Sequence, residues 1–118
     1  MVRIAIVDDD SRDIELSSAF IARYFSNSGH LFRLSTFTDG LFFMNDYKPV
    51  YDIVFMDIDM PLSNGMDVAR KLRLKDSSVI LIFMTNLAQY AAEGYDVDAV
   101  GFLVKPIDYF SFELKMRK

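Results

Sequence analysis

The sequence predicts an α/β fold with a doubly wound, five-stranded parallel sheet and helices on both faces. Two observations lead to this prediction. Five short apolar runs, several rich in β-branched residues, alternate with segments whose apolar residues recur at helical spacing. The runs at 51–57 and 78–85 are apolar at successive positions, as in parallel strands covered on both faces. Right-handed crossovers then give an open sheet, whose five-strand version usually has the order 2-1-3-4-5.

The five predicted strands differ in how their apolar residues are arranged. The first, VRIAIV, is rich in β-branched residues, and FRLSTF alternates between apolar and polar residues. SVILIFMT is the most apolar run of the chain. In order, we predict strands at residues 2–7, 32–37, 51–57, 78–85 and 99–104.

The segments between these strands predict helices, and several of them have residues that suit helix ends. Asp10 or Ser11 is placed to cap the first helix, which Gly29 ends, and Asn86 is placed to cap the fourth. Gly65 suits the turn into the third helix. We predict helices at residues 11–26, 40–47, 65–75, 87–95 and 108–118.

Length and composition indicate one compact domain and exclude several classes of protein. The 118 residues are 52% hydrophobic and 25% charged, which is enough apolar material for a core. A net charge of −4 gives no excess of positive charge that would attract nucleic acid or an anionic membrane. The absence of cysteine excludes disulfides, thiolate metal sites and a cysteine nucleophile. The chain shows no signal peptide and no apolar run near the ~20 residues that span a bilayer, so we expect a cytoplasmic protein.

Polar residues stand at the carboxyl ends of four predicted strands, where a doubly wound sheet binds its ligand. Converging carboxylates repel one another and raise their own pKa values unless a positive charge offsets them. Oxygen ligands suit a hard cation such as Mg²⁺, and a lysine supplies a second positive charge. Asp10 is better explained as a helix cap. The residues at these strand ends are Asp8, Asp9, Asp10, Asp57, Thr85 and Lys105.

The motifs VDDD, MDIDMP followed by NG, MT and KP occur in this order over essentially the whole chain. Together they resemble the receiver domain of bacterial two-component response regulators, whose fold is the CheY-like form of the flavodoxin-like sheet described above. The stretch TNLAQYAAEGYDVDAVGFLVKPID further resembles receivers that precede a LytTR-type DNA-binding domain.

The resemblance implies a phosphoryl-transfer site with Mg²⁺. In this reading Asp57 is the phosphoacceptor and also a metal ligand. Asp9 binds Mg²⁺ directly, Asp8 assists, often through water, and the backbone carbonyl of Asp59 completes the protein ligands. Side chains two residues apart on an extended chain point to opposite faces, so the Asp57 and Asp59 carboxylates serve one site only if the chain has turned.

The same resemblance assigns a switch. Thr85 binds a phosphoryl oxygen, Lys105 pairs with the carboxylate and then with the phosphate, and Phe102 follows Thr85 inward. Phe102 lacks the hydroxyl of the tyrosine that can stand there, so any hydrogen bond of that hydroxyl is lost. A cis peptide bond before Pro106 is implied as well. The surface of helix 87–95, strand 99–104 and helix 108–118 would be the output face.

The implied partner is a sensor histidine kinase, which would donate the phosphoryl group. A phosphorylation-dependent homodimer is expected on the output face. We expect the chain to be a fragment of a longer regulator, with residues 1–118 as the receiver domain and a C-terminal output domain that binds DNA. The receiver would phosphorylate and dephosphorylate itself and turn over no metabolite.

Three alternative functions follow from the same residues. A magnesium-dependent phosphatase of the haloacid dehalogenase type also carries the letters of MDID, but on its first strand. Two residues after the second aspartate it usually has threonine or valine, where this chain has Pro61. A flavodoxin-like cofactor binder would need a phosphate-cradling first loop, whereas DDDSRD is acidic. A degenerate receiver would act only as a binding module, although all the key residues are present here.

Overall fold

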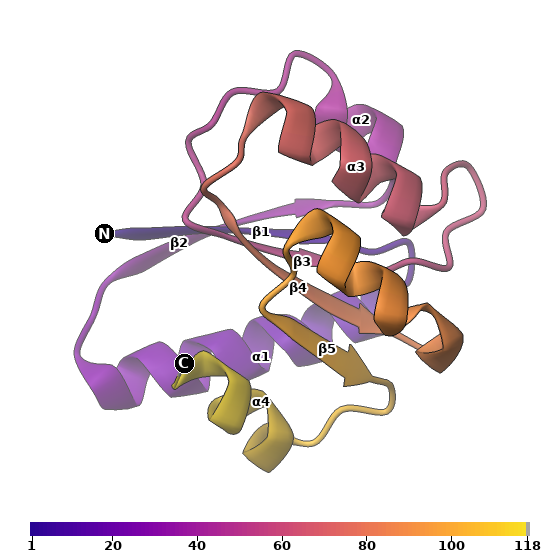
Figure 1. The fold of residues 1–118 in the computed structure, drawn as a ribbon. Helices are drawn as coiled ribbons and strands as arrows, with labels where there is room; N and C mark the ends of the chain where they lie inside the picture. The colour runs from indigo at the N-terminus through magenta and orange to yellow at the C-terminus, as the bar shows by residue number, and fades with distance from the viewer. Residues whose placement is uncertain (118) are drawn as a thin grey trace.

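The structure is a computed structural model, and it describes residues 1–117. Its five strands form one parallel sheet in the order β2-β1-β3-β4-β5. This order and the helices on both faces confirm the predicted fold (Figure 1). The strands are β1 (Val2–Val7), β2 (Phe32–Phe37), β3 (Ile53–Met56), β4 (Ile80–Thr85) and β5 (Gly101–Val104).

The helices form one layer on each side of the sheet. Figure 1 shows α1 (Ser11–Ser28) and α4 (Tyr109–Met116) together on one face. On the other face lie α2 (Gly40–Met44), α3 (Gly65–Lys75) and the 3₁₀ helix η2 (Ala92–Val97). The short 3₁₀ helix η1 (Ala88–Tyr90) follows β4.

Each face of the sheet has its own hydrophobic core, which explains the continuous apolar runs of the central strands. On β1, Ala5 and Val7 belong to the core beneath α2 and α3, whereas Ile4 and Ile6 belong to the core beneath α1 and α4. Residues of β3 divide in the same alternating way. Because successive side chains of a strand point to opposite faces, a strand buried on both faces must be apolar throughout.

The ends of α1 are set by the residues that the sequence singled out. The Asp10 side chain accepts hydrogen bonds from the amides of Arg12 and Asp13, which satisfies free donors of the first turn. Gly29 ends the helix in the left-handed conformation, with φ of 76°. Helix α1 therefore reaches Ser28, two residues beyond the predicted end.

The predicted α-helix at 87–95 is wrong. The segment forms the two 3₁₀ helices η1 and η2, and neither begins with a side-chain cap, so Asn86 does not cap a helix. Gly94 disfavours an α-helix by about 1 kcal/mol relative to alanine. Asp98, with φ of 54°, ends η2 in the left-handed conformation.

Two other predicted helices end at different positions. Helix α2 stops at Met44 rather than at residue 47, because Asp46 adopts a left-handed φ of 55°. Helix α4 ends at Met116, and residue 118 of the predicted helix 108–118 lies outside the described residues. Within residues 1–117, no helix has both the length and the apolar character needed to cross a bilayer.

Candidate functional site

Three carboxylates meet at the carboxyl end of the sheet, where β1 and β3 lie side by side. The amide of Asp57 donates to the carbonyl of Val7 over 2.9 Å, which places Asp57 next to the end of β1. Asp8 and Asp9 follow that strand directly. One carboxylate oxygen from each of Asp8, Asp9 and Asp57 lies within 4.8 Å of the others. The parallel topology thus gathers acids that are 48 or 49 positions apart in the chain.

The acids of this cluster differ in their exposure to water. Asp8 is 1% exposed and Asp57 is 5% exposed, whereas Asp9 lies at the surface. Burial raises the pKa of Asp8 to about 6, although hydrogen bonds from Lys105 and from the Asp10 amide act in the opposite direction. Burial also raises the pKa of Asp9. Ionisation of these carboxylates is therefore less favourable here than in water.

Lys105, which directly follows β5, supplies the positive charge inside the cluster. Its Nζ donates to Asp8 Oδ2 over 2.8 Å and to Asp57 Oδ2 over 3.3 Å. Burial acts to lower the pKa of Lys105, but hydrogen bonds to Asp13 and Asp8 and the charges of Asp57 and Asp8 raise it overall. Lys105 therefore remains an ammonium. The peptide bond between Lys105 and Pro106 is cis, as the resemblance implied.

Asp13 is a contact of this lysine that the sequence did not predict. Its Oδ2 lies 2.7 Å from Lys105 Nζ, the shortest of the three distances to that nitrogen. The residue lies in the first turn of α1, and its amide is fixed by the Asp10 cap. The sequence carried one signal for it: Asp13 lies in the first turn of a helix that begins directly after the acidic cluster.

The donor set fits a hard divalent cation. Every ligand atom in the three-carboxylate group is an oxygen, and one ammonium does not neutralise three carboxylates. Mg²⁺ usually takes one or two carboxylates directly and fills its other positions with further oxygens, so these three carboxylates are enough to hold it.

Thr85 and Asp59 lie at the same edge of the sheet, but neither side chain forms a hydrogen bond with Lys105 or the three carboxylates within the described residues. Thr85 is fully buried, its Oγ1 accepts from the Leu87 amide over 3.2 Å, and its carbonyl accepts from the Lys105 amide over 2.9 Å. Asp59 is exposed, and its amide donates to Asp57 Oδ1 over 3.2 Å. Within residues 1–117, no hydrogen bond joins the Thr85 hydroxyl to the three carboxylates.

Gly65 and Asn64 determine how closely α3 approaches Asp57. The Asn64 side chain caps α3 by accepting from the Met66 amide over 2.8 Å. The Gly65 amide donates to the Ile58 carbonyl over 2.9 Å, and a Cβ on Gly65 would collide with the carbonyl oxygen of Asp57. The NG pair therefore lets α3 begin directly against the main chain of Asp57.

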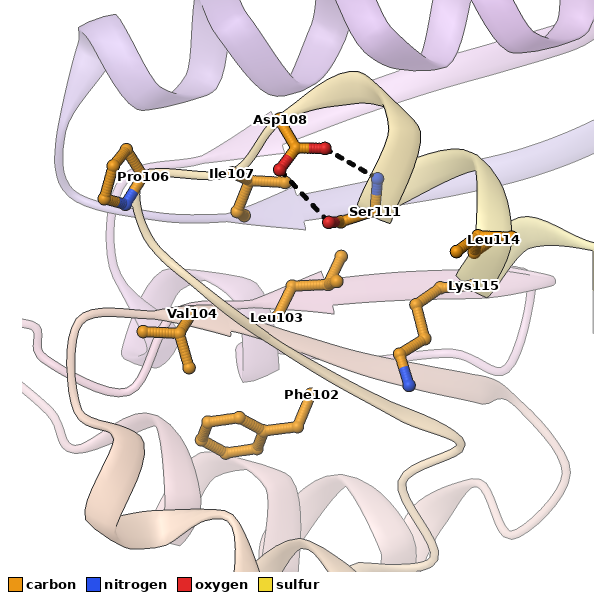
Figure 2. Close-up of a pocket in the computed structure, with 9 residues that line it drawn as sticks. All are labelled: Phe102, Leu103, Val104, Pro106, Ile107, Asp108, Ser111, Leu114 and Lys115. Atoms are coloured by element: carbon orange, nitrogen blue, oxygen red, sulfur yellow. Dashed lines mark hydrogen bonds between the residues drawn. The ribbon is translucent and has the colours of Figure 1, made fainter.

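Phe102 lies on β5, within the segments expected to form the output face. Its half-buried ring packs on Phe83 with a centroid distance of 5.8 Å and lies beside Gly94 of η2. Together with residues of β5 and α4 it lines a cavity of about 490 Å³, and in Figure 2 its ring points to the side of β5 away from α4. Figure 2 also shows Asp108 capping α4, where it accepts from the amide and the hydroxyl of Ser111 over 2.8 and 3.1 Å.

Comparison with known proteins agrees with this arrangement. Sensory transduction protein LytT of Bacillus subtilis is 31% identical over 120 residues, which cover 100% of this chain and 48% of LytT. The positive alginate biosynthesis regulatory protein of Pseudomonas aeruginosa is 39% identical over 69 residues, or 58% of this chain and 27% of that protein. The solved structure of response regulator TrrA from Thermotoga maritima, in complex with Mg²⁺ and BeF, is 26% identical. It covers 99% of this chain and 97% of its own, with a TM-score of 0.74.

These relatives support the resemblance to LytTR-type regulators, and this chain spans about half the length of LytT. The phosphatase and flavodoxin-like alternatives find no support among them. The sequence profile of the response regulator receiver domain matches residues 4–114. Over nearly its whole length, the chain therefore belongs to the response regulator receiver domain family.

Proposed function

We propose that this receiver domain accepts a phosphoryl group on Asp57 from a phosphohistidine of a sensor kinase. The position of Lys105 carries the proposal. Its ammonium lies 3.3 Å from Asp57 Oδ2, on a carboxylate that also belongs to a group of three potential metal ligands. Phosphoryl transfer requires positioning and neutralisation of negative charge more than any covalent participation by other residues, and this site offers both.

The metal ligands of this site would be the carboxylates of Asp8, Asp9 and Asp57 and the backbone carbonyl of Asp59. Mg²⁺ bound there would supply positive charge to the phosphoryl oxygens. The Lys105 ammonium provides a fixed positive charge from the carboxyl end of β5, and burial makes that charge more effective than it would be in water.

In the transfer step, a carboxylate oxygen of Asp57 forms a bond to phosphorus as the phosphorus–nitrogen bond of the phosphohistidine breaks. The imidazole leaves with the electron pair of that bond, and the product is an acyl phosphate. In the return step, water attacks phosphorus, releases inorganic phosphate and restores the Asp57 carboxylate. The domain thus modifies and restores itself, without turnover of a metabolite.

The surface change would follow from residues adjacent to the site. Among the described residues, the Thr85 hydroxyl has one hydrogen bond, from the Leu87 amide at the start of the segment that carries η1 and η2. Turning that hydroxyl toward a phosphoryl oxygen would release the Leu87 amide. Phe102, which lies beside Gly94 of η2, would then repack. The output face proposed here consists of η1, η2, β5 and α4.

The proposed biological role is control of an output by a longer regulator in the cytoplasm. The match to LytT supports a LytTR-type context, in which DNA binding would belong to a domain outside residues 1–118. A phosphorylation-dependent homodimer on the output face is part of this proposal.

The test is phosphorylation by acetyl phosphate, followed by intact mass measurement. With Mg²⁺ we expect one added phosphoryl group on the natural chain and none on Asp57→Ala. Asp67→Ala is the matched control, because this acid lies on the surface of α3 in an ion pair with Arg70. Equal phosphorylation of Asp57→Ala would overturn the assignment. Failure of the natural chain to gain a phosphoryl group would favour the degenerate receiver.

A further inference from the structure

The three N–H donors of the Lys105 ammonium are all in use. Nζ contacts Asp8 at 2.8 Å, Asp13 at 2.7 Å and Asp57 at 3.3 Å. A lysine has three donors and no more, so a new contact with a phosphoryl oxygen requires one of these contacts to be released.

The three carboxylates are not equally able to release the lysine. The side chains of Asp8 and Asp57 are 2% and 6% exposed, so before phosphoryl transfer either one would be left with a buried charge, an amide donor and no cationic partner. The side chain of Asp13 is 34% exposed, so water can solvate it when the lysine leaves. Asp13 is therefore the partner that Lys105 can give up at the lowest cost.

We infer that Asp13 is a positioning residue that holds Lys105 toward α1 before phosphorylation and restrains the switch. The inference rests on the proposed function of Asp57. Two effects of Asp13 act in the same direction. Its contact must be broken before the ammonium can reach the phosphoryl group, and its charge repels the anionic phosphoryl donor.

The start of α1 holds Asp13 in place for its contact with Lys105. Asp10 caps the helix through the amides of Arg12 and Asp13, which fixes the first turn beside the site. The contact between Asp13 and Lys105 joins residues 92 positions apart and fastens the start of α1 to the residue that follows β5. Phosphorylation would thus break the ion pair that joins the start of α1 to the end of β5.

The experiment compares Asp13→Asn with Glu15→Gln and Asp13→Glu. Asparagine keeps the shape of aspartate but removes its charge. Glu15→Gln removes the same charge from an exposed position of α1 two residues away. Asp13→Glu restores the charge. Rates of Asp57 phosphorylation by acetyl phosphate and the apparent affinity for beryllofluoride, each with Mg²⁺, are the two measurements.

Asp13→Asn is expected to raise both quantities about two- to fivefold, which is the range for a partly exposed ion pair. Glu15→Gln should leave them near the natural values, and Asp13→Glu should return them toward those values. A purely structural role would instead lower the rate in both Asp13 variants together with the melting temperature. The inference is overturned if Asp13→Asn matches Glu15→Gln or reacts more slowly than the natural chain.

The controls separate this inference from the proposed function. If the natural chain is phosphorylated on Asp57 and Asp13→Asn behaves like it, only the role of Asp13 fails. If the natural chain and Asp57→Ala give the same result, the proposed function fails and the role of Asp13 fails with it.

Discussion

Gly65 lies so close to Asp57 that no side chain fits between them. A Cβ at position 65 would collide with the carbonyl oxygen of Asp57 and lie 2.7 Å from Cα of Ile58. Gly65→Ala must therefore push α3 away from the main chain of the phosphoacceptor. We expect it to lower the free energy of unfolding by about 1–3 kcal/mol, as overpacking does. Thermal unfolding followed by circular dichroism measures this change.

Gly94→Ala is the control for this prediction. A Cβ at position 94 would meet its nearest neighbour, Cβ of Ala99, at the ordinary distance of 3.7 Å. We expect stability to remain unchanged or to rise by up to about 1 kcal/mol. Equal losses in Gly65→Ala and Gly94→Ala would show that the close approach to Asp57 has no particular cost.

Mg²⁺ should stabilise the folded chain, because the three carboxylates that would bind it meet only after folding. A ligand that binds the native state alone raises stability by mass action. We expect the melting temperature to rise with Mg²⁺ concentration and to fall again when a chelator is added. Asp9→Asn should weaken this response, whereas Asp59→Asn should keep it, because the proposed ligand there is the backbone carbonyl. An unchanged response in Asp9→Asn would argue against that residue as a ligand.

Asp8 should give the metal-free chain an unusual dependence on pH. Its pKa is raised from 3.8 to about 6 on folding, mainly by burial. Between these values the folded state binds more protons than the unfolded state, so stability falls as pH rises through this window. Asp8→Asn cannot titrate, so its stability relative to the natural chain should increase from pH 3.8 to about 6. Urea unfolding with a chelator present measures this difference, and a flat difference would contradict the shift.

The sequence predicted the sheet well because burial on both faces leaves a strong local pattern. The runs at 51–57 and 78–85 could be read from their own residues, and the position of Asp57 followed from the end of its strand. The segment at 87–95 was missed for the opposite reason. It has no side-chain cap and contains Gly94, so its conformation depends on contacts with α3 and with Phe102.

The acidic cluster could be predicted because parallel strands place their carboxyl ends at one edge. The contact between Asp13 and Lys105 could not, since it joins residues 92 positions apart and requires the side-chain direction at the start of α1. In the same way, the Thr85 hydroxyl was placed at the correct strand end, but its hydrogen bond to the Leu87 amide was not foreseen.

Arg73 of α3 anchors the segment that replaces the expected helix. Its Nε donates to the Val97 carbonyl over 2.7 Å and its Nη2 to the Asp98 carbonyl over 3.1 Å, while Nη1 donates to the Val79 carbonyl. Arg73→Ala leaves these carbonyls without a charged donor, which is expected to cost about 1–3 kcal/mol. Hydrogen exchange of the amides in 91–99 should accelerate, because η2 loses its attachment to α3.

Arg70→Ala is the matched control on the same helix. Arg70 reaches η2 through an ion pair with Glu93 at 3.0 Å, but the two side chains are 47% and 44% exposed. Exposed pairs of this kind contribute about 0–1 kcal/mol, so exchange in η2 should change little. Neither arginine contacts the acidic cluster, so both variants should still be phosphorylated on Asp57. Faster exchange in Arg70→Ala than in Arg73→Ala would show that the surface pair, and not the carbonyl contacts, holds η2 in place.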